Sequence, residues 1–470
     1  MCSSPFSKSI GQPSSSPFAP GLSITNGVEP ACPCEAHSGN RCWYIDANAD
    51  SVGAVGTINH PFNCFTNVVG YLDTISSYHQ GLLHGGDFLY IKGTFKGSLN
   101  INGMRNQNIA MYRANQGDSG NPTVIKTWPG NARAVFDGEF LMSDMLYITN
   151  ALGVKIQNVE VTRCNTRGIY IAENVKFADV NNVVVHHCQG DGISGLGGGI
   201  MFVLTSGTHN FSLHNSLFYC NMQNLIGGNN NIGGVSILSE STATANSIIN
   251  IYNNVIHGEV NGIRHKHSGN MYMNAFNNLI YNCSQGFLLR AYKMNAIYNN
   301  ILLNDTLAFG CDAENQQGDF TANIYNNTII NSLHCLNTGS GSGRGNYKRT
   351  IAFYNNIYYS PASSNVLSLG RWSNEVFDIA GWSSSFNDFY CIDSSVFLYY
   401  PPNLSKSPLD AMVYLNDNTS KFFDPGFQNV NMFALSISDS SKCRNFDKFK
   451  KDIGALPFGT EFTVDTNLYY

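Results

Sequence analysis

Short turns that end in Asn and precede an apolar run recur along most of this chain. Four of them read INIYNNVIHG (249–258), NAFNNLIYNC (274–283), NAIYNNILLN (295–304) and ANIYNNTIIN (322–331). Successive turns are separated by 24, 34, 38, 24, 22, 27 and 29 residues, and they end at Asn158, Asn182, Ser216, Asn254, Asn278, Asn300, Asn327 and Asn356. Repeats of this length without helical spacing predict stacked coils of β-strands.

Within each repeat the apolar residues alternate with polar ones, as Ile249 and Ile251 do. That spacing is typical of strands and not of helices. Gly and Asn interrupt the strands at fixed points, where turns need left-handed backbone. The fold class predicted is all-β, a right-handed parallel β-helix forming a single solenoid. The Asn side chains that end the turns should stack at one corner, at Asn254, Asn278, Asn300, Asn327 and Asn356.

The two ends of the chain differ from the repeats. Residues 1–40 form a Ser/Pro-rich extension, residues 41–360 the β-helix with its N-terminal cap, and residues 361–470 the C-terminal coils, cap and tail. The first residues, MCSSPFSKSIG, lack the basic and apolar regions of a signal peptide. A Ser/Pro segment is ordered when it docks on something. The extension is therefore an expected contact for a homo-oligomer or filament.

Composition excludes two classes of partner. Charged residues are 13% of the chain and the formal net charge is −5, which gives no sign of general nucleic-acid binding. No apolar run approaches the roughly 18 residues that span a membrane. The 13 cysteines favour an oxidising location, either extracellular or on the surface of a cell or virion.

Cysteines and histidines raise two further questions. Cys164 and Cys188 are 24 residues apart and should lie on adjacent coils, either as a disulfide or as a reduced ladder. His186 and His187 precede Cys188 and suggest a metal, but consecutive strand residues point to opposite faces. A disulfide framework is also open for the N-terminal cluster of Cys32, Cys34, Cys42 and Cys64.

Two cations occupy the same point of successive repeats. Lys266 lies four residues after Gly262, and Arg290 lies four residues after Gly286, so the cations are 24 residues apart. The turns that end at Asn254 and Asn278 have the same separation. Adjacent strands lie about 4.8 Å apart. Two cations held this close indicate a polyanionic ligand; the alternative is an ordinary solvated basic surface.

A uronate polysaccharide is such a polyanion, and these residue types suit its cleavage by β-elimination. The reaction needs a neutralised carboxylate, a base and an acid. Arg290 disfavours the charged form of Lys266 and lowers its pKa. We therefore expect Lys266 as base, Arg290 on the carboxylate and Tyr292 as a proton donor or acceptor.

Alternation along this strand predicts which side chains face outward. Ile263 and His265 should point into the coil, with His265 buried, and Arg264 and Lys266 should point out. Arg264 and Lys293 are accordingly expected to bind substrate.

Several segments carry a family resemblance. The WYIDAN opening, GNPTVIKTWPG (120–130), the YNN and FNN turns and the DIGA close together resemble secreted right-handed parallel β-helix proteins. Residues 225–300 resemble, in part, polysaccharide lyase family six, which includes chondroitinase B and alginate lyases. That resemblance implies a catalytic Lys at Lys266 and a catalytic Arg at Arg290. It also implies a Ca²⁺ ion held by Glu259, Asn261 and Asn230, although Asn261 stands where the family prefers Glu.

Two classes of function are open from the sequence. The first is binding, and cleavage by a polysaccharide lyase activity, of an acidic polysaccharide on an outward groove. The alternative is a non-catalytic structural or adhesive β-helix, such as a fibre, filament or receptor-binding spike. Formation of an unsaturated sugar product distinguishes them.

Overall fold

The structure is a computed structural model that describes residues 41–65, 68–69, 71–72, 78–79, 81–97, 109–112, 119–149, 151–172, 175–189, 197–221, 233–239, 247–266, 271–289, 295–311, 320–338, 349–360, 366–368, 381–391, 398–400, 404–429, 434–447 and 451–455. The chain divides into two units. We call Ile24–Asn250 the N-terminal unit, and Ile251–Tyr470 with Met1–Ser23 the C-terminal unit.

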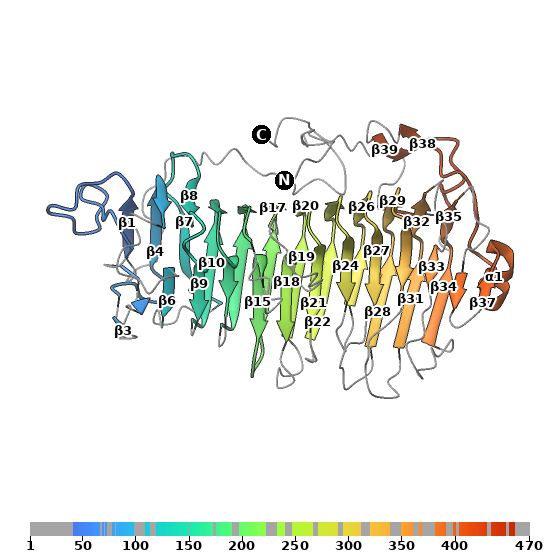
Figure 1. Cartoon of the computed structure of the whole chain (residues 1–470), viewed down its shortest axis with the longest axis horizontal. Helices are drawn as coiled ribbons and strands as arrows, with labels where there is room; N and C mark the ends of the chain where they lie inside the picture. Colours follow the sequence, from blue (N-terminus) through green and yellow to red (C-terminus); the bar gives the residue numbers. More distant parts are fainter. Residues whose placement is uncertain are drawn as a thin grey trace. The chain divides into compact units, whose positions relative to one another are not determined.

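The N-terminal unit contains three parallel sheets, seen in blue to green in Figure 1. The first consists of β1 (Cys42–Asp46), β4 (Phe88–Lys92), β7 (Thr123–Thr127), β10 (Gly153–Gln157), β13 (Phe177–Asn181) and β16 (Asn210–His214). The second consists of β5 (Thr94–Lys96), β8 (Ala134–Asp137), β11 (Val159–Thr162), β14 (Val184–His186) and β17 (Leu217–Tyr219). The third consists of β6 (Ile109–Tyr112), β9 (Asp144–Thr149), β12 (Arg167–Ile171), β15 (Gly198–Leu204) and β18 (Gly233–Ser239). A separate antiparallel pair is formed by β2 (Tyr71–Leu72) and β3 (Tyr78–His79).

The C-terminal unit repeats the arrangement. Its first sheet contains β22 (Met271–Phe276), β25 (Asn295–Tyr298), β28 (Phe320–Tyr325), β31 (Arg349–Tyr354) and β34 (Trp382–Ser385). The second contains β20 (Val255–His257), β23 (Leu279–Tyr281), β26 (Ile301–Leu303), β29 (Thr328–Ile330), β32 (Ile357–Tyr359) and β35 (Asp388–Tyr390). The third contains β21 (Asn261–Lys266), β24 (Gln285–Leu289), β27 (Leu307–Cys311), β30 (His334–Asn337), β33 (Leu367–Ser368), β36 (Leu398–Tyr400) and the antiparallel β37 (Leu404–Lys406). The remaining elements are β19 (Ser247–Tyr252), which crosses the boundary between the units, α1 (Pro408–Tyr414), and the antiparallel pair β38 (Phe427–Asn429) and β39 (Ala434–Ile437).

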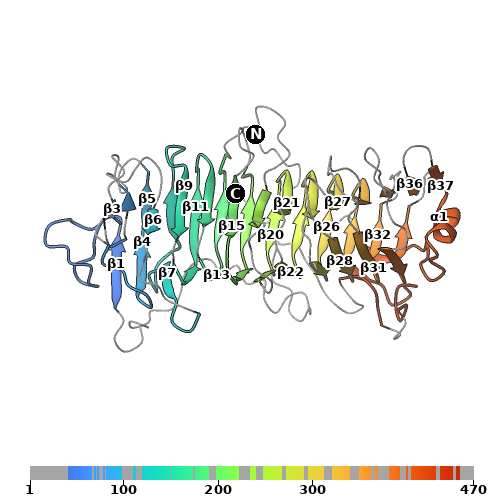
Figure 2. The same ribbon diagram turned by 90° about the horizontal axis from the view of Figure 1, so that it is seen from below.

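Successive coils place one strand in each of three parallel sheets, and Figure 2 shows the same succession from below. The predicted class, an all-β parallel β-helix, is confirmed. Apolar residues that point into the coil stack on one another to form the core. Ile156, Val180 and Leu213, for example, are in register on β10, β13 and β16, and all three are fully buried.

The predicted Asn stack is confirmed in the C-terminal unit. The Oδ1 of Asn278 accepts hydrogen bonds from both the backbone N–H and the Nδ2 of Asn254, at 3.1 and 3.0 Å. The same pair of bonds recurs down the stack, through Asn300, Asn327, Asn356 and Asn387. All of these side chains are fully buried. Each coil is therefore bonded to the next at one corner.

The other two positions of the Y-N-N turn have their own roles. The first Asn adopts the left-handed conformation that reverses the chain, with φ between 53° and 57° at Asn253, Asn277, Asn299, Asn326 and Asn355. The aromatic residue before it points outward and stacks on its neighbours. The ring centroids are 4.9 to 5.0 Å apart and the rings are within 7° of parallel, at Tyr252, Phe276, Tyr298, Tyr325 and Tyr354.

The last described segment packs back onto the second sheet of the C-terminal unit. Ile453 and Cys443 belong to one buried apolar cluster with Ile357, and the N–H of Gly454 donates to the carbonyl of Asn355 at 3.0 Å. Gly454 has φ +87°, and a Cβ there would lie 2.7 Å from Ile357 Cδ1. Only glycine fits this approach, which explains the DIGA sequence.

A buried carboxylate anchors the same segment. Asp388 accepts from the N–H of Phe423 at 2.8 Å and from the Sγ of Cys443 at 3.1 Å. Burial raises the pKa of Asp388 to about 7. The anchor therefore titrates near neutral pH.

Cys164 and Cys188 form a reduced ladder and not a disulfide. Both thiols are fully buried, and each donates to the carbonyl two residues before it at 3.7 Å. Cys42, in contrast, is disulfide-bonded. No helix in the described part of the chain is long and apolar enough to cross a membrane.

Candidate functional site

The strands that carry the predicted basic pair are in the expected register. Asn261 pairs with Gln285, and Ile263 pairs with Phe287, in the ladder between β21 and β24. The separation of 24 residues is therefore the coil length at this point of the fold. Ile263 and His265 are fully buried, as alternation predicted.

Most of the predicted site residues lie outside the described residues. Lys266 ends β21, but its side chain is not among those described. The same is true of Arg290, Tyr292, Lys293 and Asn230, which lie wholly outside the described ranges. Their roles in catalysis and binding stay predictions.

Arg264 differs from the expectation of an open outward position. Its side chain is only 2% exposed, and Leu288, its partner in the ladder, is buried as well. This point of β21 and β24 is covered. A guanidinium at this depth has no open face for a glycan. Alternation along a strand predicts the side on which a side chain lies, but it does not predict whether other residues cover that side chain.

The two described residues of the predicted calcium set are also buried. Glu259 is 3% exposed and Asn261 is fully buried. Ca²⁺ takes six to eight oxygen ligands, commonly from several carboxylates, and these two side chains fall short of that set. Among the residues described, no group of three His, Cys, Asp or Glu side chains is arranged to hold a metal. Calcium binding stays a prediction.

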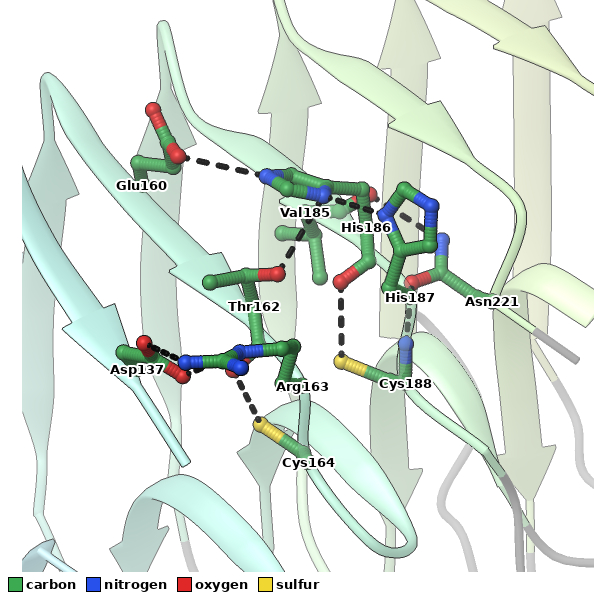
Figure 3. A network of polar contacts seen from close by, with 10 residues as sticks. All are labelled: Asp137, Glu160, Thr162, Arg163, Cys164, Val185, His186, His187, Cys188 and Asn221. Carbon is green, nitrogen blue, oxygen red and sulfur yellow. Dashed lines mark hydrogen bonds and ion pairs between the residues drawn. The ribbon is translucent and has the colours of Figure 1, made fainter. Parts of the chain in front are cut away.

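A polar network lies on the second sheet of the N-terminal unit (Figure 3). Asp137, Thr162, His186 and Tyr219 occupy one row, because the ladders pair them in that order on β8, β11, β14 and β17. The rings of His186 and Tyr219 stack at 4.7 Å within 5° of parallel. The row therefore carries a polar side chain on each of four successive coils.

The hydrogen bonds of this network determine which nitrogen of each histidine carries a proton. His186 Nε2 lies 3.2 Å from Glu160 Oε1, and a carboxylate accepts, so Nε2 is the donor. In neutral His186, Nδ1 is then an acceptor, and it lies 2.6 Å from Nδ1 of His187. His187 therefore donates from Nδ1 and keeps a lone pair on Nε2.

Electrostatics agree with this arrangement. The hydrogen bond from His186 is the main cause that lowers the pKa of Glu160. Burial, and then the neighbouring His186, lower the pKa of His187. Glu160 is therefore ionised and His187 neutral near pH 7.

The expectation that His186 and His187 point to opposite faces is wrong. His187 has a left-handed backbone with φ +57°, which turns the chain and brings its ring to the same side as that of His186. The signal was present in the sequence, because His187 stands at a coil corner that Asn occupies in later repeats.

Arg163 occupies the same corner one coil earlier. Its backbone φ is +53°, and its N–H donates to the carbonyl of His186. Nε donates to Asp137 Oδ1 at 2.8 Å, and Nη2 pairs with Asp137 Oδ2. The Arg163 side chain is 44% exposed. A guanidinium held in place by its own carboxylate is thus presented at the surface, one coil before His187 (Figure 3).

Comparisons with known proteins give similarity of fold. No family model and no curated protein match the sequence. Pectate lyase Pel9A matches in structure with a TM-score of 0.51 and 16% identity, over 90% of this chain and 97% of that one. A rhamnogalacturonan lyase matches with a TM-score of 0.50 and 13% identity, over 80% and 98%. A mannuronic acid-specific family 6 polysaccharide lyase from human gut microbiota matches with a TM-score of 0.44 and 13% identity, over 81% and 87%.

Proposed function

We propose that this chain binds an acidic, uronate-containing polysaccharide and cleaves it by β-elimination. The observation that carries the proposal is the ladder between β21 and β24, whose separation of 24 residues is also that between Lys266 and Arg290. The parallel β-helix fold supports it, because Pel9A and the rhamnogalacturonan lyase, which match at TM-scores of 0.51 and 0.50, are both lyases by name. Similarity of fold alone does not assign a reaction, so the proposal depends on the pair of Lys266 and Arg290.

The proposed chemistry assigns one task to each residue. Lys266 removes the proton on the carbon next to the sugar carboxylate. The electron pair forms a carbon–carbon double bond, and the bond to the 4-linked oxygen breaks. Arg290 holds the carboxylate and disfavours the ammonium form of Lys266. Tyr292 gives a proton to the leaving oxygen.

Binding is spread over more residues than the reaction is. Lys293 supplies a further cation for the anionic chain. Arg264, being buried, contributes its charge and not a direct contact. No step of this mechanism passes through calcium. A polysaccharide substrate places the protein outside the cell or on a cell or virion surface, where we propose that it acts.

A substrate screen tests the proposal. Alginate, chondroitin, pectate and a heparin-like glycan are incubated with the full chain, and ultraviolet absorbance records the unsaturated product. Retardation in gels that contain each glycan measures binding separately. Product from one of them is the expected result. Binding without product would favour an adhesive β-helix, and neither binding nor product would favour a structural filament.

A further inference from the structure

One corner of the coils is occupied by two different kinds of residue. A single left-handed residue turns the chain directly after β11, β14 and β17 in the N-terminal unit and after β20, β23, β26 and β29 in the C-terminal unit. In the C-terminal unit this residue is one that adopts the conformation easily, at Gly258, Asn282, Asn304 and Asn331. In the N-terminal unit it is Arg163, His187 or Cys220, with φ of 53°, 57° and 52°.

Arg163 and His187 are poor choices for the turn itself. A left-handed residue other than Gly or Asn costs roughly 1–2 kcal/mol. Such outliers persist where the side chain is needed and the surrounding structure compensates for the strain. The chain demonstrably can use Asn at this corner, so the side chains of Arg163 and His187 serve some purpose other than turning it.

Both side chains present unused polar atoms. Arg163 commits Nε and Nη2 to Asp137, and no hydrogen bond is made by its Nη1 within the described ranges. His187 commits Nδ1 to His186, and its Nε2 likewise makes none within those ranges. Since the relay from Glu160 holds the lone pair on Nε2, the corner offers a donor and an acceptor on adjacent coils.

An exposed aromatic ring accompanies them. Phe140 is 40% exposed, and its backbone N–H donates to the carbonyl of Arg163 at 2.6 Å. Its own φ is +55°, a second costly left-handed residue at the same place. An exposed ring and a charged donor on two residues whose backbones are hydrogen-bonded are a combination suited to sugars, which have an apolar face and polar edges.

We propose that Phe140, Arg163 and His187 form a binding subsite for one uronate unit of a polysaccharide. Nη1 of Arg163 donates to the sugar carboxylate, Nε2 of His187 accepts from a sugar hydroxyl, and the ring of Phe140 packs against the apolar face of the sugar. No bond is made or broken there. The choice of a uronate rests on the proposed function, and the subsite lies on residues of the N-terminal unit, which the lyase proposal does not use.

Calorimetric titration of the full chain with oligogalacturonate tests the subsite. Arg163→Asn and His187→Asn each introduce the residue that the corner has at Asn282, Asn304 and Asn331, so both variants should fold. Arg163→Asn should bind roughly tenfold more weakly, the size of loss for a hydrogen bond to a charged group, and His187→Asn about threefold to tenfold more weakly, as for a neutral hydrogen bond. Lys155→Asn on β10 is the matched control, because it removes one cation from another sheet of the same unit, and it should bind as the unaltered chain does.

A second ligand isolates the role of the carboxylate. Methyl-esterified oligogalacturonate has no charge for Arg163 to hold, so Arg163→Asn should leave its affinity unchanged and His187→Asn should still weaken it. If both Asn variants bind oligogalacturonate as tightly as the unaltered chain, the subsite is wrong and the lyase proposal stands. If the unaltered chain binds neither oligogalacturonate nor oligomannuronate, the subsite proposal falls, and the lyase proposal is then decided by the substrate screen on chondroitin and the heparin-like glycan.

Discussion

His186 and His187 face each other through their Nδ1 atoms at 2.6 Å, with their rings crossed at 83°. One proton fits between two nitrogens at that distance, and a second would place two donors opposite each other. An additional proton can enter on Nε2 of His187 without disturbing the contact between the two Nδ1 atoms, and burial and then the neighbouring His186 disfavour it by lowering the pKa of His187. This property makes the network sensitive to mild acid.

Acidification should destabilise the protein through His187. Its pKa in the folded chain lies below the ordinary 6.5, so the folded state binds fewer protons than the unfolded state. The stabilisation is present above about pH 6.5 and is lost as the pH falls toward the folded pKa. Thermal unfolding from pH 7.5 to 5 should show a smaller loss in Tm for His187→Asn than for the unaltered chain. Because burial also lowers the pKa of His209 and His257, only the difference between the two curves is diagnostic, and parallel curves would contradict the assignment.

Asp388 should have the opposite effect on stability. Burial raises its pKa from 3.8 to about 7, so the folded state binds more protons across that range. Stability should fall as the pH rises from about 4 to 7, by a few kcal/mol at about 1.4 kcal/mol per pKa unit. Asp388→Asn keeps an acceptor for the Phe423 N–H and cannot ionise, so its unfolding should vary less with pH. Asp424→Asn, at an exposed neighbour, is the control, and an equal flattening there would remove Asp388 as the cause.

Asn300→Ala should be strongly destabilising. Its Nδ2 donates to the carbonyls of Ala275 and Tyr298 and to Asn327 Oδ1, at 2.9, 3.1 and 3.0 Å. Truncation leaves several buried polar groups without partners, at roughly 1–3 kcal/mol each. Denaturant unfolding should show a loss of several kcal/mol. Asn299→Gly, one residue away and left-handed, should lose much less, and equal losses would mean that the turn and not the stack stabilises the corner.

Lys266→Ala should abolish turnover while glycan binding largely survives, because the proposed base acts on the transition state. Arg290→Ala should reduce both turnover and glycan binding, because the Arg290 side chain is proposed to hold the sugar carboxylate and to lower the pKa of Lys266. Product formation and gel retardation on the same glycan measure the two effects. Unchanged turnover in Lys266→Ala would eliminate this mechanism.

Calcium binding through Glu259, Asn261 and Asn230 predicts a calcium-dependent Tm. Added Ca²⁺ should raise the Tm, EDTA should reverse the rise, and Glu259→Gln should abolish it. A Tm that does not respond to Ca²⁺ would exclude the ion as a structural ligand.

The repeat made the fold predictable. Asn side chains can stack only if successive coils are in register. The spacing of the Asn residues from Asn254 to Asn356 therefore predicted both the length of each coil and the corner at which the stack lies. Asn387 was missed because its turn reads F-N-D, although it continues the stack and its N–H donates to Ser420 Oγ at 2.9 Å. A search for the Y-N-N sequence finds only that sequence. The corner itself requires a residue with left-handed backbone followed by an Asn whose side chain points into the coil.

The polar network was less accessible from the sequence. The rule that consecutive residues face opposite ways holds within a strand and fails at a left-handed corner, which is where His187 stands. The burial of Arg264 was not predictable either, because a strand pattern contains no information about what lies over an outward position. Direction was predictable, and exposure was not.

In the Asn stack of the C-terminal unit, the distance between successive coils does not depend on the number of residues in each coil. Between successive members the chain runs through 24, 22, 27, 29 and 31 residues, yet each Nδ2 to Oδ1 distance is 2.9 or 3.0 Å. The contact between successive coils at this corner is therefore independent of the number of residues in the coil. Such a scaffold can therefore accept inserted peptide between its strands in any of these coils, without a change in the contacts that hold successive coils together.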